Sequence, residues 1–388
     1  MKVPVIHIIT MLELGGAQQN TLYTLASLDR SKYRPVLIAG EGGPLVQDAL
    51  SLEGVETHFV SELVREIRPL TDLAALFNIY GLIRGIVKNS GNAPVIVHTH
   101  SSKAGILGRV AAYLAGARII VHTVHGFGFN DRQGRLKRGL LVAAERLAAV
   151  ITGRFVAVAS DNIDKGVKER ILTRGNSEVV RSGIDIGRFS SPPEDVNAVR
   201  AGMGVPPDAP VVSMISCLKP QKAPVDFVRV AASVLRKSPD AHFVQAGDGE
   251  LRNAMLDEAN RLGVADRLHL LGWRRDVGDI IHASDVVVLT SLWEGLPRVV
   301  PQAMAAGKPV VATAVDGTPE AVKDGVTGFL ASPHDVEYMA GKVALLLSDK
   351  ALAVKMGEAA KKGVAEFGQD EMVRRIERLY DKLLKEKA

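Results

Sequence analysis

Cysteine is almost missing from this chain of 388 residues, in which Cys217 stands alone. A single cysteine excludes an intramolecular disulfide framework and fits a reducing compartment. Also missing is any uncharged apolar run of the roughly 18 residues that a membrane-spanning helix needs. The apolar start, MKVPVIHIIT, is followed by no small-residue cleavage site, so it predicts a first strand and not a signal peptide. These absences together predict a cytoplasmic globular protein.

A large excess of charge is missing as well, since the formal net charge is +5. One stretch is nevertheless basic, opposed only by Asp131 and Glu145. Its basic residues are Arg132, Arg135, Lys137, Arg138, Arg146 and Arg154. A solvated helix face is the simpler interpretation and is slightly favoured. The alternative hypothesis is an interfacial patch that binds anionic lipid on the inner face of the cell membrane.

Short apolar segments alternate with helical patterns along the whole chain. In the first half the predicted strands are 3–9, 34–39, 55–60, 94–99, 118–124 and 155–158. In the second half they are 210–216, 241–246, 267–271, 285–290, 309–313 and 328–330. The predicted helices include 17–29, 71–89, 103–115, 135–149, 222–237, 250–262, 334–347 and 370–386. Strands separated by helices predict an α/β fold of doubly wound parallel sheets with right-handed crossovers.

Composition shifts once, in SSPPEDVNAVRAGMGVPPDAP at residues 190–210, which is rich in proline and in small or polar residues. This segment predicts a domain boundary. We therefore expect a Rossmann-like domain at 1–189, a linker at 190–209, and a second Rossmann-like domain at 210–369. The helix at 370–388 is expected to pack back on the first domain. Two such sheets would present the carboxyl ends of their strands to a central cleft, where doubly wound sheets bind ligands.

The loop GGAQQN, residues 15–20, follows the first predicted strand and opens a helix. Gly15 and Gly16 would let the backbone approach a ligand closely, and a helix start offers unpaired N–H groups to an anion. A tight turn without a ligand explains these residues equally well. The loop is not G-x-G-x-x-G, and no acidic residue closes a second strand at the usual distance. A dinucleotide-dependent dehydrogenase is therefore disfavoured.

Two predicted strands end in histidines, in VHTHSSKAG (97–105) and VHTVHGFGF (121–129). Four histidines could suggest a metal, but His98 and His122 alternate with apolar residues inside strands, and no nearby carboxylate pair completes a site. We therefore expect no metal here, and we interpret His98 and His122 as buried, hydrogen-bonded side chains. His125 lies at the carboxyl end of its strand beside a glycine, which suits hydrogen bonding to a hydroxyl-rich ligand.

The turn SCLKPQKAP, residues 216–224, follows the first strand of the second predicted domain. Lys219 and Lys222 flank its proline, and two ammonium groups at such a turn could hold a diphosphate. Lysines in a turn are more often only solvated, and without further context that explanation is favoured. The G-x-G turn in QAGDGELR (245–252) is a weak signal that we interpret as a tight loop.

The stretch SLWEGLPRVVPQAMAAGKPVVAT, residues 291–313, is predicted to end a buried strand and continue through a loop and a helix into another strand. Glu294 lies in the loop, and Gln302 points along the face that the helix start also presents. A carboxylate and an amide bind hydroxyl groups well but suit bare phosphate poorly, so phosphate would be held by the helix start and the lysines. This pattern favours a ligand with hydroxyl groups at both ends and charge in the middle, which is the form of a nucleotide sugar.

In their order and spacing these motifs resemble the retaining glycosyltransferases of family 4, which share the two-domain GT-B fold. The resemblance covers nearly the whole chain and is carried by LELGGAQ, HTHSSKAGILGR, HTVHGFGF, RSGID, LKPQK, GDGELR, LGWRRDV, WEGLPRVVPQAMAAGKPVVAT, DGTPE and GVTGFL. HTHSSKAGILGR with HTVHGFGF is most similar to members that build bacterial exopolysaccharide, capsule or lipopolysaccharide O-antigen chains.

The resemblance assigns roles to the residues of the 294–302 segment. The family has an acid-x7-acid motif whose first acid contacts hydroxyl groups of the donor sugar, and Glu294 matches it. The second acid binds the nucleotide ribose, and its place is taken by Gln302, which implies weaker ribose recognition without charge. Gly295, Leu296 and Pro297 belong to the same donor-binding loop.

The resemblance also implies a diphosphate clamp made by an arginine and a lysine five residues apart. Lys222 matches the lysine, but Cys217 occupies the arginine position, so half of the clamp departs from the family pattern. Lys219 is a candidate substitute for that arginine. His125 matches the histidine that contacts the sugar.

The implied activity is transfer of a glycosyl unit from a nucleotide sugar, with a UDP-sugar favoured, and with retention at the anomeric carbon. The implied acceptor is a hydroxyl group of a saccharide or of an undecaprenyl-diphosphate-linked saccharide, and Gly15 and Gly16 match the loop that approaches diphosphate and acceptor. The resemblance implies no metal and no other cofactor, and we expect no nucleic-acid partner.

Two alternatives from other classes remain open. One is a sugar-nucleotide epimerase, which uses a similar two-domain fold. The other is a catalytically silent nucleotide-sugar-binding subunit, which the departures at Cys217 and Gln302 would fit.

Overall fold

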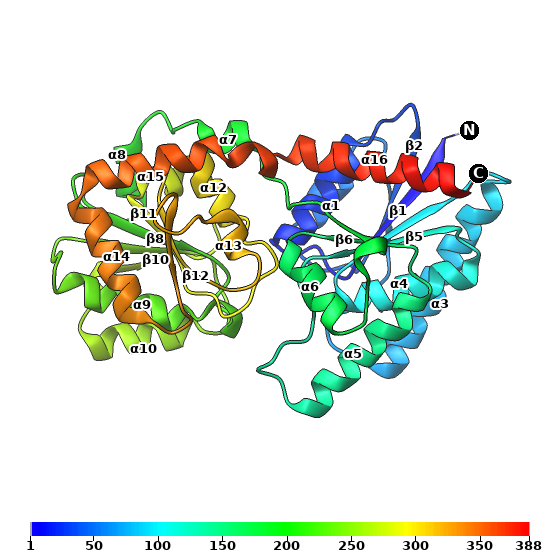
Figure 1. Cartoon of the computed structure of the whole chain (residues 1–388), viewed down its shortest axis with the longest axis horizontal. Coiled ribbons are helices and arrows are strands. Elements are labelled where there is room, and N and C mark those ends of the chain that lie inside the picture. Colours follow the sequence, from blue (N-terminus) through cyan, green and yellow to red (C-terminus); the bar gives the residue numbers. More distant parts are fainter. Residues whose placement is uncertain (1, 388) are drawn as a thin grey trace. The chain divides into compact units, whose positions relative to one another are not determined.

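The computed structural model describes residues 2–387, which form two compact units (Figure 1). Unit 1 runs to Gly183 and takes up the chain again at Gln369, and unit 2 is the segment Ile184–Gly368 between them. Unit 1 is therefore discontinuous in sequence. The helix predicted at 370–386 belongs to it.

Unit 1 is built on a seven-stranded sheet in the order β3-β2-β1-β4-β5-β6-β7, and every neighbouring pair is parallel. The strands are β1 Val3–Ile9, β2 Tyr33–Ala39, β3 Glu56–Phe59, β4 Ile96–His100, β5 Ile119–Val124, β6 Arg154–Ala157 and β7 Ser177–Val179. The register places His7 beside His98, and His100 beside Thr123. Because helices cover both faces, β1, β4 and β5 are buried along almost their whole length, including their histidines. The short β7 was not among the predicted strands.

The helices of unit 1 are α1 Gly16–Ser27, α2 Val46–Leu50, α3 Pro69–Asn89, α4 Ser102–Ala115, α5 Arg135–Val150, α6 Ser160–Lys168 and α16 Gln369–Lys387. One face of the sheet packs on α3 and α4, with Ile79 and Ile83 buried there. The other face packs on α16, whose Ile376 and Leu379 lie against Val5 and other strand residues. The three- and four-residue spacing of the apolar side chains in α16 explains why this charged segment docks as an amphipathic helix.

By length and composition, α3 is the one helix among residues 2–387 that could cross a membrane. One of its faces, which includes Ala75 and Ile86, is buried in unit 1. Its first turns leave Leu70, Leu73 and Phe77 exposed. Unit 1 therefore has an exposed apolar surface at the start of α3.

Unit 2 has a six-stranded parallel sheet in the order β10-β9-β8-β11-β12-β13. The strands are β8 Val211–Ile215, β9 His242–Ala246, β10 Leu268–Leu270, β11 Val286–Leu289, β12 Val310–Thr313 and β13 Gly328–Ala331. The helices are α7 Ile186–Ser190, α8 Val196–Gly202, α9 Pro224–Leu235, α10 Arg252–Leu262, α11 Val277–Ala283, α12 Val299–Ala305, α13 Thr318–Ala321, α14 Val336–Ser348 and α15 Lys350–Lys362.

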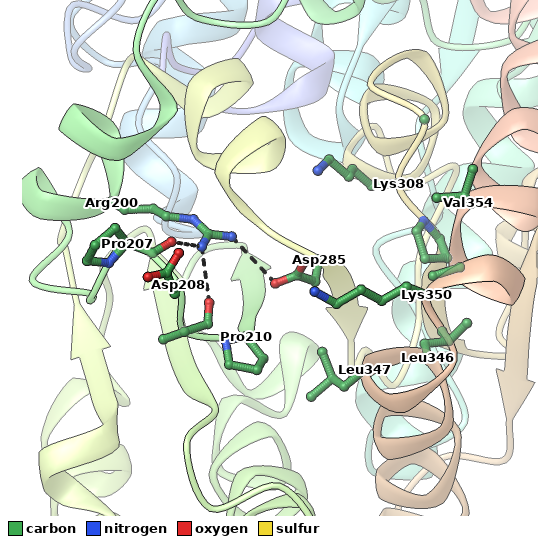
Figure 2. Close-up of a pocket in the computed structure, with 14 residues that line it drawn as sticks. Arg200, Pro207, Asp208, Pro210, Asp285, Lys308, Leu346, Leu347, Lys350 and Val354 are labelled. Atoms are coloured by element: carbon green, nitrogen blue, oxygen red, sulfur yellow. Dashed lines mark hydrogen bonds and ion pairs between the residues drawn. The ribbon is translucent and has the colours of Figure 1, made fainter.

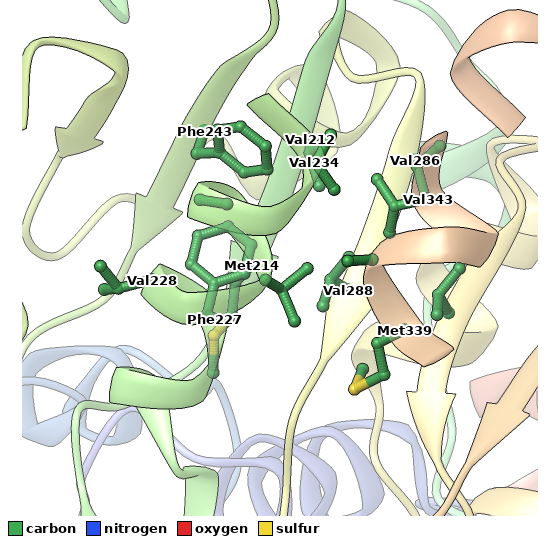
Figure 3. Packing of buried hydrophobic residues seen from close by; sticks show 14 of the residues in the cluster. Val212, Met214, Phe227, Val228, Val234, Phe243, Val286, Val288, Met339 and Val343 are labelled. Atoms are coloured by element: carbon green, nitrogen blue, oxygen red, sulfur yellow. The ribbon is translucent and has the colours of Figure 1, made fainter. Parts of the chain in front are cut away.

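The main core of unit 2 lies between its sheet and the helices α9 and α14 (Figure 3). Phe227 of α9 and Phe243 of β9 meet edge to face, with ring centroids 5.9 Å apart. Val288 of β11 and Met339 of α14 lie in the same cluster. This packing fixes the two strands, β8 and β11, from which the candidate site loops emerge.

The prediction that residues 190–209 form a linker between domains is wrong. The division between the units falls at Gly183 and Ile184, and the segment 190–209 lies inside unit 2 and contains α8. The Asp195 carboxylate caps α8 by accepting hydrogen bonds from the backbone N–H groups of Asn197 and Ala198 at 2.8 and 3.0 Å. Met203 and Val205 then bury against the sheet. The proline-rich composition predicted a domain boundary, but an aspartate cap and buried apolar residues decide the local structure.

Candidate functional site

The sheet of unit 2 reverses its order between β8 and β11, which are hydrogen-bonded neighbours. Their chain connections leave in opposite directions, so the loops after these two strands diverge and leave room for a ligand at the carboxyl edge of the sheet. The lysine loop, residues 216–223, follows β8, and the acidic loop, residues 290–298, follows β11. Both loops had been singled out from the sequence, and unit 2 brings them together.

The lysine loop rests on the glycine turn after β9. Leu218 donates its N–H to the carbonyl of Asp248 at 3.0 Å, and Leu251 donates to the carbonyl of Leu218 at 3.0 Å. At Gly247, which has φ of +129°, a Cβ would lie 2.0 Å from the carbonyl oxygen of Ser216. Only glycine allows this close approach. The G-x-G turn therefore packs against the lysine loop and holds its backbone in place.

Lys222 and Glu294, one from each loop, form an ion pair. The exposed fractions of their side chains are 16% and 6%, so the pair is largely shielded from water. Ser291 donates its hydroxyl to the same Glu294 oxygen at 2.6 Å. A shielded ammonium next to a carboxylate gives this edge of the sheet one group for phosphate and one for hydroxyl groups.

Further hydrogen bonds lock the two loops to each other. Leu292 donates its N–H to the carbonyl of Gln221 at 2.7 Å, and Gln221 donates its amide to the carbonyl of Trp293 at 2.8 Å. Thr290 donates its hydroxyl to the carbonyl of Lys222 at 2.8 Å. Lys222 and Glu294 are thus held by reciprocal backbone contacts and not by their ion pair alone.

The rest of the 294–302 segment runs from the loop into α12. Gly295, Leu296 and Pro297 are all buried, and the carbonyl of Gly295 accepts a hydrogen bond from Gly317 at 3.0 Å. Gln302 lies half-buried on α12. Its side chain makes no hydrogen bond with any residue in the described range, so its amide is available to a ligand.

Sequence reasoning did not single out three neighbours of this site. Asp316 accepts a hydrogen bond from the backbone N–H of Glu294 at 2.5 Å, and Ser291 bonds the Glu294 carboxylate. Burial lowers the pKa of Arg298, beside Pro297, to about 10. The DGTPE motif, which contains Asp316, was the sequence signal that could have identified the first of them.

Cys217, which takes the place of the family's arginine, and its candidate substitute Lys219 lie at the start of the lysine loop. Cys217 is a free, partly exposed thiol. Lys219 precedes the short 3₁₀ turn Pro220–Lys222 and is partly exposed. Both therefore lie on the same loop as Lys222, as the sequence spacing requires.

In unit 1 the corresponding reversal falls between β1 and β4. Gly15 precedes α1 in extended backbone and Gly16 is its first residue. His125 follows β5, and the next residue, Gly126, has φ of +119°, a region that favours glycine. The Nε2 atom of His125 lies 3.1 Å from Nδ1 of His100.

Three buried histidines, His7, His98 and His100, bring their ring nitrogens within 4.8 Å of one another. All six nitrogens already have protein hydrogen-bond partners, among them the hydroxyl of Tyr380. The cluster is therefore a hydrogen-bonded network and not a preformed set of metal ligands. Burial lowers the pKa of His7 to about 3 and holds the pKa values of His98 and His100 well below the usual range.

The interpretation of His98 and His122 as satisfied buried histidines is confirmed. His98 bonds through both nitrogens, and His122 Nδ1 lies 2.9 Å from the hydroxyl of Thr99. Burial also lowers the pKa of His122 well below its usual range.

A cavity of about 320 Å³ opens in unit 2 at the opposite, amino edge of its sheet (Figure 2). Pro210 before β8, Asp285 before β11 and Lys308 before β12 line it. Arg200 of α8 pairs with Asp285 at 3.6 Å and donates a hydrogen bond to the carbonyl of Ala209 at 3.2 Å. Since doubly wound sheets bind their ligands at the carboxyl edge, we do not assign this cavity to the candidate site.

Two family descriptions match the chain. "Glycosyl transferase 4-like domain" matches residues 15–165, and "Glycosyl transferases group 1" matches residues 195–363. The first match lies within unit 1 and the second within unit 2.

Known proteins are similar over all or most of the chain. UDP-Gal:alpha-D-GlcNAc-diphosphoundecaprenol alpha-1,3-galactosyltransferase of Escherichia coli is 32% identical over 383 residues, which are 98% of this chain and 96% of that protein. D-inositol 3-phosphate glycosyltransferase of Streptomyces avermitilis is 32% identical over 71% of this chain and 62% of its own length. The crystal structure of HepE from Anabaena with UDP and glucose is similar with a TM-score of 0.81 and 20% identity, covering 97% of this chain and 99% of HepE.

Proposed function

This chain belongs to the family 4 glycosyltransferases, and from that premise we propose that it moves a hexosyl unit from a UDP-sugar to a hydroxyl group of a lipid-linked saccharide. The fold class is GT-B, with two Rossmann-like units, as predicted. The proposed setting is synthesis of a cell-surface polysaccharide. The relative from Escherichia coli supports this choice, because its name combines a UDP-sugar donor with a diphosphoundecaprenol-linked acceptor.

The observation that carries the proposal is the Lys222–Glu294 pair at the order reversal of unit 2. A bound diphosphate would compete with Glu294 for the ammonium group of Lys222, because both offer anionic oxygens. Glu294 would then accept hydrogen bonds from hydroxyl groups of the donor sugar. The two residues would thus orient the donor and stabilise negative charge on its leaving group.

The proposed reaction follows the retaining, same-face route that the family resemblance implies. The bond between the anomeric carbon and the phosphate oxygen breaks as the acceptor hydroxyl oxygen bonds to that carbon, and the acceptor proton passes to the departing diphosphate. No protein nucleophile is required. Lys222 and, in place of an arginine at Cys217, Lys219 would hold the diphosphate, and Gln302 would bond the ribose.

The family resemblance also assigns roles to residues of unit 1. His125 is assigned to the transferred sugar, and the loop at Gly15 and Gly16 to the diphosphate and acceptor. No metal or other cofactor is part of the proposed reaction.

A thermal-shift screen with UDP, GDP, ADP and their sugars tests donor binding, since a ligand that binds only the folded state must stabilise it. We expect UDP and one UDP-hexose to raise Tm, and the variant Glu294→Gln to lose more of the shift with the sugar nucleotide than with UDP. Mass analysis of products with and without a GlcNAc-diphospho-lipid acceptor then separates the classes. Transfer supports the proposal, donor isomerisation without acceptor indicates an epimerase, and binding without turnover indicates a silent subunit.

We further propose that α5 holds unit 1 against the inner face of the cell membrane. Leu136, Leu140, Leu147 and Val150 lie at helical spacing on α5 and are between 65% and 84% exposed. Such an apolar stripe fits an interfacial helix. The exposed side chains at the start of α3 add to the apolar surface of unit 1.

The basic stretch contributes less charge than its composition predicted. Arg138 and Arg146 pair with Glu169, and Arg154 pairs with Glu386 at 3.5 Å. Apolar insertion is therefore the larger part of the proposed contact.

Co-sedimentation with vesicles of phosphatidylglycerol and of phosphatidylcholine tests this contact. The double variant Leu136→Ser/Leu140→Ser should lose binding to anionic vesicles, and the control Val354→Ser, at an exposed valine of α15, should not. Binding by the full chain should weaken with salt because its charged part is screened. Equal binding by the wild type, the double variant and the control, or no binding by the wild type, would refute the membrane proposal.

A further inference from the structure

A continuous series of buried hydrogen bonds crosses unit 1 and ends at His125. Its members come from β1, β4, β5, the residue after β5 and the helix α16, and all belong to unit 1. In order they are Thr123, His98, Tyr380, His7, His100 and His125. We call this series the histidine relay.

The distances along the relay are those of ordinary to short hydrogen bonds. Thr123 Oγ1 lies 2.6 Å from His98 Nε2. The hydroxyl oxygen of Tyr380 lies 2.5 Å from His98 Nδ1 and 3.0 Å from His7 Nε2. His7 Nδ1 lies 2.9 Å from His100 Nε2, and His100 Nδ1 lies 3.1 Å from His125 Nε2.

Each internal member of the relay can donate only one hydrogen bond along it. A neutral imidazole has one N–H and one acceptor nitrogen, so a histidine that accepts on one side must donate on the other. A phenol oxygen could accept from two histidines, but within the described residues the Tyr380 hydroxyl bonds only His98 and His7, so its own proton must go to one of them. His7, His98 and His100 are buried and held in the neutral form. All the bonds must therefore run in the same direction, and reversing one of them requires reversing all of them.

Thr123 decides that direction. Within the described residues its buried hydroxyl has no hydrogen-bonding partner other than His98. If His98 donated to Thr123, the threonine proton would be left buried without an acceptor, which is unfavourable. Thr123 therefore donates to His98, His98 to Tyr380, Tyr380 to His7, His7 to His100, and His100 to Nε2 of His125.

We propose that the relay fixes the proton of His125 on Nδ1, and that Tyr380 of α16 is a positioning residue for glycosyl transfer. The second part rests on the proposed function, in which His125 contacts the sugar. Because Nε2 of His125 accepts from His100, this histidine acts as a hydrogen-bond donor through Nδ1 and not as a general base through Nε2. The C-terminal helix thereby controls a side chain at the carboxyl edge of the sheet.

Two substitutions interrupt the relay at different places. Tyr380→Phe removes the hydroxyl at its middle, and Thr123→Val removes the donor at its start while keeping the size of the side chain. Thr123→Ser keeps the hydroxyl and serves as the rescue. Tyr33→Phe is the matched control, because the Tyr33 hydroxyl is also buried against α16 but bonds Asp381 at 2.5 Å, outside the relay.

The tautomer of His125 is read from long-range ¹H–¹⁵N correlations of the histidine rings in the labelled full chain, with His125 assigned from the spectrum of His125→Gln. We expect protonated Nδ1 in the wild type, Tyr33→Phe and Thr123→Ser. We expect a changed or mixed tautomer in Tyr380→Phe and Thr123→Val. A wild-type proton on Nε2, or no change in either interrupted variant, would overturn the relay.

Turnover with the donor and acceptor is measured on the same proteins, with thermal unfolding to compare their stability. Tyr380→Phe and Thr123→Val should lower kcat about ten-fold, the size of effect expected when one hydrogen bond to a reacting group is misdirected, while Tyr33→Phe and Thr123→Ser should keep it. A changed tautomer with unchanged kcat would overturn the role of Tyr380, and with it the assignment of His125 to the sugar. Failure of the wild type to transfer any sugar would overturn the proposed function instead, and the tautomer measurement would still decide the relay.

Discussion

At the scale of single residues, the candidate donor site depends on Lys222 and Glu294, which were named from the sequence and which the structure brings into contact. The contact gives the ammonium group an anionic partner in the free protein. A diphosphate must compete with that partner, and the Ser291 hydroxyl also donates to the Glu294 oxygen that pairs with Lys222. The pair can therefore respond to donor binding without leaving a shielded charge unpaired.

Replacing Lys222 by alanine should lower turnover by about 10²–10³, the usual size for the loss of one electrostatic stabiliser of a developing charge. Steady-state transfer rates at saturating donor check this. Lys355→Ala, at an exposed lysine of α15, is the control and should transfer sugar like the wild type. Near wild-type turnover of Lys222→Ala would remove this lysine from the site.

Gln302→Ala should raise the donor KM more than it lowers kcat. The reason is that a ribose contact is similar in the ground state and in the transition state, so its loss weakens the binding of the donor and of the transition state to the same extent. Among residues 2–387 the Gln302 side chain has no hydrogen-bond partner, so its removal should not disturb α12. A loss confined to kcat would contradict the assignment to the ribose.

At the scale of secondary-structure elements, sequence patterns did not predict the buried ion pair between α4 and α5. Arg109 donates to the carboxylate of Glu145 at 2.6 Å, and both side chains are almost fully buried. Arg109 also donates to the carbonyl of Gly105 at 2.8 Å. In the sequence, Glu145 stands out only as an acid that opposes the basic stretch.

Glu145→Leu should lower the free energy of unfolding by about 3–5 kcal/mol, because it leaves the Arg109 guanidinium buried without its partner. The double variant Arg109→Met/Glu145→Leu should recover most of that loss, since it removes both charges. Urea unfolding at neutral pH measures both. Arg174→Ala, which breaks the exposed pair with Asp164, should have a much smaller effect. A double variant no more stable than Glu145→Leu would contradict this account.

At the scale of the whole molecule, unit 1 is completed by a helix that the chain reaches only after building unit 2. The α16 side chains Ile376, Leu379 and Tyr380 fill one face of the unit 1 sheet. Folding of unit 1 therefore needs both ends of the chain. The same helix supplies the Tyr380 hydroxyl in the middle of the histidine relay, so the packing of α16 also affects the hydrogen bonds that reach His125.

The buried histidines of unit 1 should make stability depend on pH. Their folded pKa values lie below the unfolded value near 6.5, so the unfolded chain binds more protons below that pH. Their contribution is fully present above pH 6.5 and is lost as pH falls, by up to about 1.4 kcal/mol per pH unit for each histidine. Urea midpoints at pH 7.5, 6.5 and 5.5 should therefore decrease most between the last two. A constant midpoint over this range would show that the three rings are not buried in the neutral form.

The sequence by itself determined the two doubly wound sheets, since alternating apolar strands and amphipathic helices leave few other ways to bury their surfaces. It also identified both loops of the donor site, because each follows a predicted strand and carries a residue, Lys222 or Glu294, that matches a family motif. Tertiary structure alone decided that these two side chains touch, that 190–209 folds into unit 2, and that Tyr380 meets histidines from β1 and β4. These contacts join positions that are 72 to 373 residues apart in the sequence, and they depend on packing and register, which local patterns do not encode.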